Sequence, residues 1–137
     1  PVALVRSSAE EVDAAAIVLD VDDAPERWTL DPRRFRQVLT NVLRNALQAT
    51  PPGRAPAVRV ARAGARLVIE VRDFGAGIPD ADLDRIFDPF FTTHTVGTGL
   101  GLPVARRIVE LHGGTLRAGN APEGGAVFRI EIPQQAG

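Results

Sequence analysis

Two clusters of alternating glycines constrain this chain more than any other feature of its sequence. They span Asp73–Gly77 and Gly97–Gly101. Because glycine lacks a Cβ atom and tolerates positive φ, such loops can present consecutive backbone N–H groups to a phosphate at close range. The first cluster follows the strand-like run Leu67–Val71, and the second opens a helical pattern whose N-terminus favours an anion. The two clusters predict a nucleotide-binding loop system. Taken alone, Gly75 and Gly77 could equally be simple turn residues, and a flexible hinge also fits the second cluster.

An aromatic run, Phe87–Phe91, lies between the two glycine clusters. Its phenylalanines fit a hydrophobic anchor for a lid over the binding site better than a stacking surface. His94 follows this run, and taken alone it reads as a solvent-facing residue of the lid.

The composition restricts the chemistry that is open to the chain. With 137 residues and 45% hydrophobic content, we expect residues 1–137 to form one domain with a buried core. The absence of cysteine excludes thiolate zinc sites and thiol nucleophiles, and all 16 basic residues are arginine, which excludes a phosphate-loop lysine. The net charge of −1 gives no footprint for nucleic acid, and no apolar run reaches the ~20 residues of a membrane span. Because the first residue is not Met, we expect an excised domain.

Hydrophobic periodicity predicts the regular elements. The clearest is a helix over Arg33–Thr50, which follows the capping pair Asp31-Pro32. A second helix is predicted over Leu102–His112, and a short helix is expected within residues 2–15. Runs of apolar and β-branched residues predict strands at Ile17–Val21, Arg27–Leu30, Ala57–Ala61, Arg66–Arg72, Thr115–Ala118 and Ala126–Ile132.

Three polar residues stand at positions that suit a ligand. Asn41 and Asn45 are four residues apart, so they share one helix face beside the apolar stripe, where amide oxygens could serve a hydrated Mg²⁺ or phosphate. Two solvated side chains are the alternative for this pair alone. Asp73 ends a strand two residues before Gly75, where a buried carboxylate can accept a hydrogen bond from an amine such as that of adenine. An ordinary strand-to-turn aspartate is the alternative there.

The order and spacing of these motifs resemble a known family. Asn41 and Asn45, Asp73-x-Gly75-x-Gly77, Phe87–Phe91 and Gly97-x-Gly99-x-Gly101 are similar to the N, G1, F and G2 boxes of sensor histidine kinases. The resemblance runs from the strands near Ile17 to the last strand at Ile132. It implies an α+β fold, a two-layer α/β sandwich of the Bergerat (GHKL) type with one mixed sheet covered by helices on one face. The lid is similar to that of nitrogen-regulation-type sensor kinases.

The resemblance also implies a role for each matching position in binding Mg-ATP. Asn45 is implied as the Mg²⁺ ligand, Asn41 lies near the phosphates, and Asp73 bonds the adenine amine. His94 completes the implied catalytic set with Asn41 and Asn45. It stands at a position where relatives commonly carry lysine. Because histidine is only partly protonated at neutral pH, no fixed positive charge is implied there. The other implied nucleotide contacts come from the boxes and the lid: Gly75, Gly77, Ile78, Phe87, Thr92, Thr93, Gly97, Thr98, Gly99, Leu100, Gly101 and Leu102.

The implied enzyme is an ATP-dependent protein-histidine kinase, of which this chain is the catalytic domain. It would transfer the γ-phosphoryl group to a histidine on a separate dimerisation domain, which serves a response regulator in two-component signal transduction. For the isolated domain we expect a cytoplasmic monomer without direct contact with membrane or nucleic acid. For the full-length kinase we expect a homodimer.

Two other classes share some of these features. Hydrolases of the same superfold, such as gyrase, Hsp90 or MutL relatives, and anti-sigma serine kinases carry a glutamate four residues before the metal-binding asparagine. That position is Asn41 here, so no base is placed for hydrolysis. A nucleotide-binding scaffold without catalysis is the third reading, which intact box residues disfavour.

One departure from the family pattern is Phe74, where many relatives carry asparagine.

Overall fold

The computed structural model describes residues 2–13, 17–25, 28–88 and 101–134. Its helices are α1 (Val2–Asp13), α2 (Pro32–Ala49) and α3 (Gly101–Leu111), and short 3-10 turns lie at Asp80–Asp82 and Arg85–Phe87. Its strands are β1 (Val18–Asp23), β2 (Ala57–Ala63), β3 (Arg66–Arg72), β4 (Thr115–Asn120) and β5 (Ala126–Pro133).

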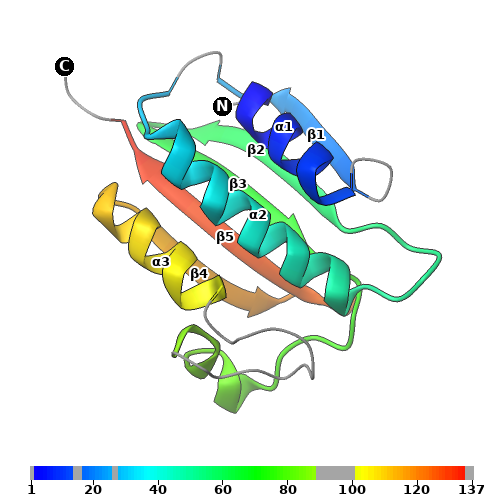
Figure 1. Ribbon diagram of the computed structural model, residues 1–137. Coiled ribbons are helices and arrows are strands. Elements are labelled where there is room, and N and C mark those ends of the chain that lie inside the picture. Colours follow the sequence, from blue (N-terminus) through cyan, green and yellow to red (C-terminus); the bar gives the residue numbers. More distant parts are fainter. Residues whose placement is uncertain (1, 14–16, 26–27, 89–100, 135–137) are drawn as a thin grey trace.

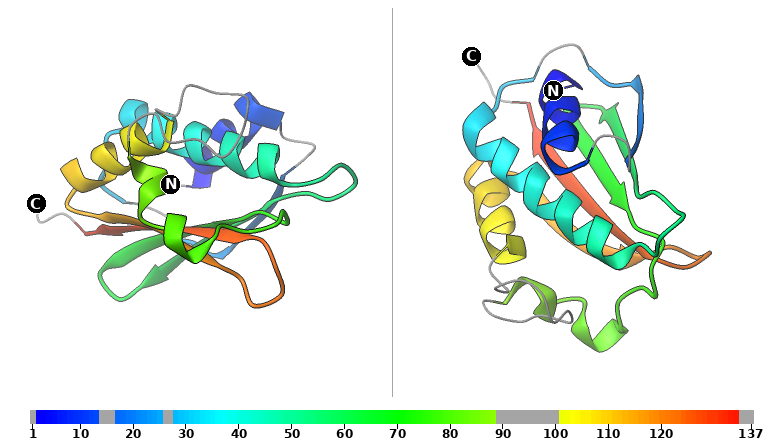
Figure 2. Two further views of the ribbon diagram at one scale, coloured as in Figure 1. Left: turned by 90° about the horizontal axis from the view of Figure 1, so that it is seen from below. Right: turned by 45° about the vertical axis from the view of Figure 1, so that its right-hand side comes forward.

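The strands form one mixed sheet in the order β1-β2-β3-β5-β4. β1 runs parallel to β2, whereas the β2–β3, β3–β5 and β4–β5 pairs are antiparallel. Figure 1 shows α1, α2 and α3 in front of the sheet, and Figure 2 shows them on the same side of it from two other directions. This arrangement confirms the two-layer α/β sandwich with a mixed sheet that the sequence motifs imply.

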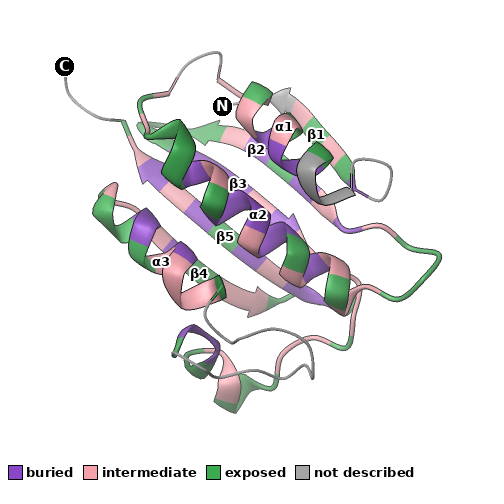
Figure 3. Cartoon of the chain, in the orientation of Figure 1, coloured by how far each residue is buried: buried purple, intermediate pink, exposed green. Residues whose placement is uncertain are grey.

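The core lies between α2 and the central strands. α2 turns an apolar stripe toward the sheet, and Figure 3 shows buried residues at intervals along α2 and along the strands β3 and β5 behind it. The period of two along each strand supplies the other half of the core, so that alternate residues of β5 are fully buried. Each large apolar side chain buried in this way contributes roughly 1.5–3 kcal/mol to folding. The largest side chains with less than 2% exposure are Phe35, Leu39, Leu43, Leu67, Ile69, Leu116, Phe128, Ile130 and Ile132.

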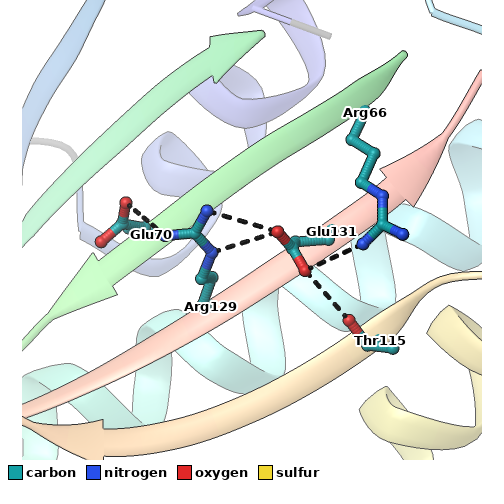
Figure 4. Close-up of polar contacts among 5 residues, drawn as sticks. All are labelled: Arg66, Glu70, Thr115, Arg129 and Glu131. Carbon is teal, nitrogen blue, oxygen red and sulfur yellow. Dashed lines mark hydrogen bonds and ion pairs between the residues drawn. The ribbon is translucent and has the colours of Figure 1, made fainter. Parts of the chain in front are cut away.

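The opposite face of the sheet is polar. Arg129 lies between two carboxylates there, with nitrogens 3.5 Å from Glu70 Oε1 and 3.3 Å from Glu131 Oε1 (Figure 4). Glu131 also accepts from Arg66 at 3.4 Å and from the Thr115 hydroxyl at 3.5 Å. Exposed ion pairs of this kind contribute about 0–1 kcal/mol each. Their main effect is to keep a sheet face that no described helix covers compatible with water.

The strand predicted at Arg27–Leu30 is wrong. Trp28, Thr29 and Leu30 lie outside any strand, and Arg27 is outside the described residues. Trp28 and Leu30 pack against the core as partly buried side chains, so their apolar character serves packing and not strand pairing. β1 therefore has no partner strand at Trp28–Leu30. It pairs in parallel with β2, and α2 lies in the long crossover connection that parallel strands require.

The limits of α2 follow from local chemistry. Asp31 is the N-cap, and its Oδ1 accepts the N–H groups of Arg33 at 3.0 Å and Arg34 at 3.2 Å, with proline at the first helical position. Thr50 closes the helix, because both its N–H and its hydroxyl bond Ala46 O. The helix predicted over Arg33–Thr50 therefore forms within one residue of its expected limits.

His112 connects the end of α3 to the start of α2. Its Nε2 accepts the Asp31 N–H at 3.0 Å, so the ring proton lies on Nδ1, which donates to Ile108 O at 2.9 Å. The imidazole also packs edge-on against Phe35, with 5.8 Å between the ring centroids. The residue that ends the last turn of α3 therefore also satisfies a backbone N–H at the N-cap of α2.

We expect His112→Ala to lower the free energy of unfolding by about 1–2 kcal/mol, because the Asp31 N–H loses its acceptor and Phe35 loses an aromatic neighbour. Differential scanning calorimetry measures this loss. Arg107→Ala, an exposed change on the same helix, is the matched control. Equal melting temperatures for the two variants would show that the connection contributes nothing.

Candidate nucleotide-binding site

The carboxylate of Asp73 is buried at the end of β3, with the residue only 2% exposed. Its Oδ1 accepts two backbone N–H groups, from Gly75 and from Ala126, each at 3.0 Å. The Asp73 N–H also donates to Ala126 O at 3.0 Å, which extends the β3–β5 pairing by one residue. Two charge-assisted hydrogen bonds compensate the buried oxygen Oδ1. No described residue donates to Oδ2, which leaves one carboxylate oxygen for a further donor.

The loop after Asp73 is held from two sides by residues that the sequence motifs do not identify. On the helix side, the Phe74 N–H donates to Thr50 Oγ1 at 3.2 Å. On the sheet side, the Asn120 side chain accepts the Ile78 N–H and donates to Ile78 O, both at 2.7 Å. Asn120 stands in a strand, where asparagine is disfavoured, and that was the only signal in the sequence that could have pointed to it.

The glycines of this loop have a packing reason of their own. A Cβ atom on Gly75 would lie 2.3 Å from the backbone oxygen of Ala49, at the end of α2. Gly77 has φ +84°, and a Cβ atom there would lie 2.7 Å from Asn120 Oδ1. Close approach to α2 and β4 therefore requires glycine here before any ligand is considered. A nucleotide contact at Gly75, Gly77 or Ile78 stays a prediction.

One face of α2 extends from this loop to the start of α3. Asn41, Asn45 and Ala49 are four residues apart, so they follow one another along that face at intervals of about 6 Å. At one end the Asn41 Nδ2 donates to Gly101 O at 3.1 Å, and at the other Ala49 lies against Gly75. Asn45 is half-buried between them, and it forms no hydrogen bond with the described residues. The structure therefore brings Asn41 and Gly101 together, 60 residues apart in the chain.

Phe87 and Leu102 pack inward. Phe87 is 8% exposed and belongs to the hydrophobic core, and the Arg106 guanidinium lies over its ring at 4.6 Å from the centroid. Leu102 and Ile78 are partly buried against the same core. Phe87 therefore anchors the segment before the lid, as the aromatic run suggests. The other lid and second-cluster positions, Phe90, Phe91, Thr92, Thr93, His94, Gly97, Thr98, Gly99 and Leu100, lie outside the described residues.

Phe74 contacts arginines. The guanidinium carbons of Arg54 and Arg72 lie over its ring, at 4.2 Å and 4.6 Å from the centroid. Arg72 is itself held at the β4–β5 turn, by Glu123 at 3.3 Å and by Gly124 O at 3.3 Å. Cation–π contacts of this kind contribute about 0.5–1 kcal/mol at exposed sites. The residue that departs from the family pattern thus has a role in holding the loop to its neighbours.

We expect Gly75→Ala to destabilise the chain by about 1–3 kcal/mol, because the new methyl group would overlap the Ala49 carbonyl and force the loop away from α2. Gly119→Ala on β4 is the matched control, since a Cβ atom there meets nothing within 4 Å. Urea unfolding of both variants measures the difference. Coincident unfolding midpoints would contradict the close approach of the loop to α2.

Comparisons with known proteins identify the family of the chain. Residues 30–136 match the family described as "Histidine kinase-, DNA gyrase B-, and HSP90-like ATPase". The chain is 44% identical over 132 residues to the signal transduction histidine-protein kinase AfsQ2 of Streptomyces coelicolor. The aligned region covers 90% of this chain and only 24% of AfsQ2.

Two solved structures have the same fold. The mycobacterial sensor histidine kinase MprB superposes with a TM-score of 0.87 at 28% identity, covering 99% of this chain and 95% of that structure. Full-length ShkA in complex with AMPPNP superposes with a TM-score of 0.83 at 28% identity, covering 98% of this chain and 30% of ShkA. The chain belongs to the histidine kinase-, DNA gyrase B- and HSP90-like ATPase family.

Proposed function

We propose that residues 1–137 are the catalytic ATP-binding domain of a two-component sensor histidine kinase. The domain binds Mg-ATP and transfers the γ-phosphoryl group to a histidine on a separate dimerisation domain. The observation that carries this proposal is the face of α2 on which Asn41 bonds Gly101, Ala49 lies against Gly75 of the loop after Asp73, and Asn45 stands between them. The sensor kinase names of the matched relatives support it, as does the ATP analogue in the ShkA complex.

Each end of this face suits one end of ATP. Asp73 keeps Oδ1 engaged with backbone N–H groups, and Oδ2 then accepts the exocyclic amine of adenine. At the other end, the N-terminus of α3 at Gly101 offers backbone N–H groups and a partial positive charge to the phosphates, together with Gly97 and Gly99. Thr92, Thr93, His94, Thr98, Leu100 and Leu102 are the proposed contacts from the lid and from the start of α3.

Asn45 is the proposed protein ligand of Mg²⁺. The described residues contain no group of three or more His, Cys, Asp or Glu side chains that could hold a metal ion by themselves. A single amide oxygen fits Mg²⁺ nevertheless, because this ion keeps several waters and is usually held in part by the substrate phosphates. When bound, the ion neutralises charge on the β- and γ-phosphates.

Asn41 favours phosphoryl transfer over hydrolysis. The hydrolases of this superfold carry a glutamate at this position, whereas an amide cannot accept the proton of an attacking water. The Asn41 amide nitrogen already donates to Gly101 O, so the side chain positions the start of α3. Transfer to an incoming histidine needs positioning and charge stabilisation more than a base, and this site supplies both.

The finer assignments complete the proposal. We assign the lid to the nitrogen-regulation type, from the Phe90-Phe91-Thr92-Thr93 sequence. No helix in the described part of the chain has the length and apolar content to cross a bilayer. We propose a cytoplasmic domain that is monomeric in isolation, and a homodimeric full-length kinase whose dimerisation domain passes the phosphoryl group to a response regulator.

We expect Asp73→Asn to leave the fold intact and to lower ATP affinity by about 10–100-fold. The asparagine oxygen can still accept the two backbone N–H groups, but an NH₂ group replaces Oδ2 and faces the adenine amine. Guanine has a carbonyl oxygen where adenine has this amine, so the preference for ATP over GTP should also decline. Titration calorimetry with both nucleotides decides. Unchanged ATP affinity and preference would return Asp73 to a purely structural role.

We expect this chain to phosphorylate its dimerisation domain in trans, and to show almost no self-phosphorylation or hydrolysis alone. The experiment incubates the chain with γ-labelled Mg-ATP, with and without the dimerisation domain of the same kinase, and with a partner whose acceptor histidine is replaced by glutamine. Label should appear only on the histidine-bearing partner, in an acid-labile and base-stable form. Asn45→Ala should abolish transfer, whereas Arg44→Ala, an exposed neighbour, should not.

Other outcomes identify the alternatives. Rapid phosphate release without a partner would favour an ATPase of the same superfold. An acid-stable label on a serine would favour a serine kinase, and tight nucleotide binding without any transfer would favour a non-catalytic scaffold.

A further inference from the structure

Asn120 makes a contact that the family motifs do not assign. It is the last residue of β4, the strand at one edge of the sheet. Its amide bonds both polar groups of the Ile78 backbone, accepting from N–H and donating to C=O at 2.7 Å each. A neighbouring strand would form the same pair of hydrogen bonds, so this side chain continues the pairing where the backbone of β4 ends. A primary amide of this length supplies both a donor and an acceptor.

Gly77 is matched to this contact. It adopts φ +84°, and any Cβ atom would lie 2.7 Å from Asn120 Oδ1. The second glycine of the loop therefore lets the backbone approach the Asn120 oxygen more closely than a side chain would permit.

The backbone of Asn120 is connected to Asp73 as well. Asn120 is the cross-strand partner of Ala126 in the β4–β5 pair, and the Ala126 N–H is one of the two donors to Asp73 Oδ1. The turn between these strands is closed by Ala121 N–H to Gly125 O at 2.9 Å, and a Cβ atom on Gly125 would lie 2.1 Å from Asp73 O. The end of one hairpin therefore holds both Asp73 and Ile78.

We propose that Asn120 is a positioning residue for nucleotide recognition: its two hydrogen bonds to Ile78 fix the far end of the loop whose near end carries the Asp73 carboxylate. The inference rests on the proposed function, because Asp73 recognises the base there. Asn120 is exposed, so water can replace its hydrogen bonds and the global fold loses little when they are removed. The cost falls on binding, because a loosened loop must be ordered when the nucleotide arrives.

The test compares Asn120→Ala and Asn120→Asp with Arg117→Ala, an exposed change on the same strand. We expect both Asn120 variants to lose about tenfold in affinity, by the same factor for Mg-ATP, Mg-ADP and adenosine, because the loop serves the base end of the ligand. An ionised aspartate keeps the acceptor and the size of asparagine but repels Ile78 O, so it should not rescue binding at neutral pH. Calorimetric titrations give the affinities, and amide exchange without nucleotide should be faster at Ile78 in Asn120→Ala, which removes the acceptor of the Ile78 N–H.

The controls separate positioning from stability. The unfolding midpoints of both Asn120 variants should stay close to that of Arg117→Ala. Unchanged affinity in Asn120→Ala, wild-type affinity in Asn120→Asp, or an affinity loss explained by partial unfolding would overturn the inference while the proposed function stands. If the unaltered chain binds no nucleotide, the proposed function fails, and this inference fails with it.

Discussion

The geometry of the site depends on one buried carboxylate. Asp73 is 2% exposed, and a charge in that position must be compensated by hydrogen bonds. Two backbone N–H groups that meet at Oδ1 provide this compensation, one from the loop after β3 and one from β5. The hydrogen bonds that Asp73 Oδ1 requires therefore fix where β3 ends and how the loop after it turns. They also fix how closely the β4–β5 hairpin approaches the end of β3.

α2 transmits this fixed point to the rest of the site. Its C-terminal residue, Ala49, lies against Gly75, and Asn41 reaches the start of α3 two turns away. An α-helix is stiff on this scale, so the distance between the loop after Asp73 and the start of α3 follows from its rise of about 1.5 Å per residue. The length of α2 thereby sets the distance between two segments that are far apart in sequence.

Local sequence patterns predicted the elements better than their partners. The apolar period of 3.6 residues and the capping pair Asp31-Pro32 were sufficient to place α2, because both signals act within a few residues. The apolar run at Trp28–Leu30 was misleading, since side chains that pack on a core resemble those of a strand. The parallel pairing of β1 with β2 depends on a long crossover, which a local pattern does not record.

The same difference between local sequence signals and contacts of distant residues applies to the site. Glycine spacing and the asparagine pair pointed to the loop after β3 and to the face of α2 that extends from this loop to Gly101, and their part in nucleotide binding stays a prediction. Thr50 and Asn120 were missed, because their importance lies in hydrogen bonds to backbone groups at distant positions in the chain. Part of the reason for the first glycine cluster was also missed, because Gly75 and Gly77 are required by protein neighbours that only the folded chain brings close.

The two connections between α2 and α3 restrict how these helices can turn against each other. His112 connects the end of α3 to Asp31, and Asn41 connects to Gly101 at the start of α3. The attachment points are about 15 Å apart on α2, which is close to the length of α3. A single attachment would leave α3 free to pivot, whereas two attachments at opposite ends remove that rotational freedom. The two attachments therefore oppose pivoting of α3 against α2, and they hold the start of α3 beside the face of α2 that carries Asn41 and Asn45.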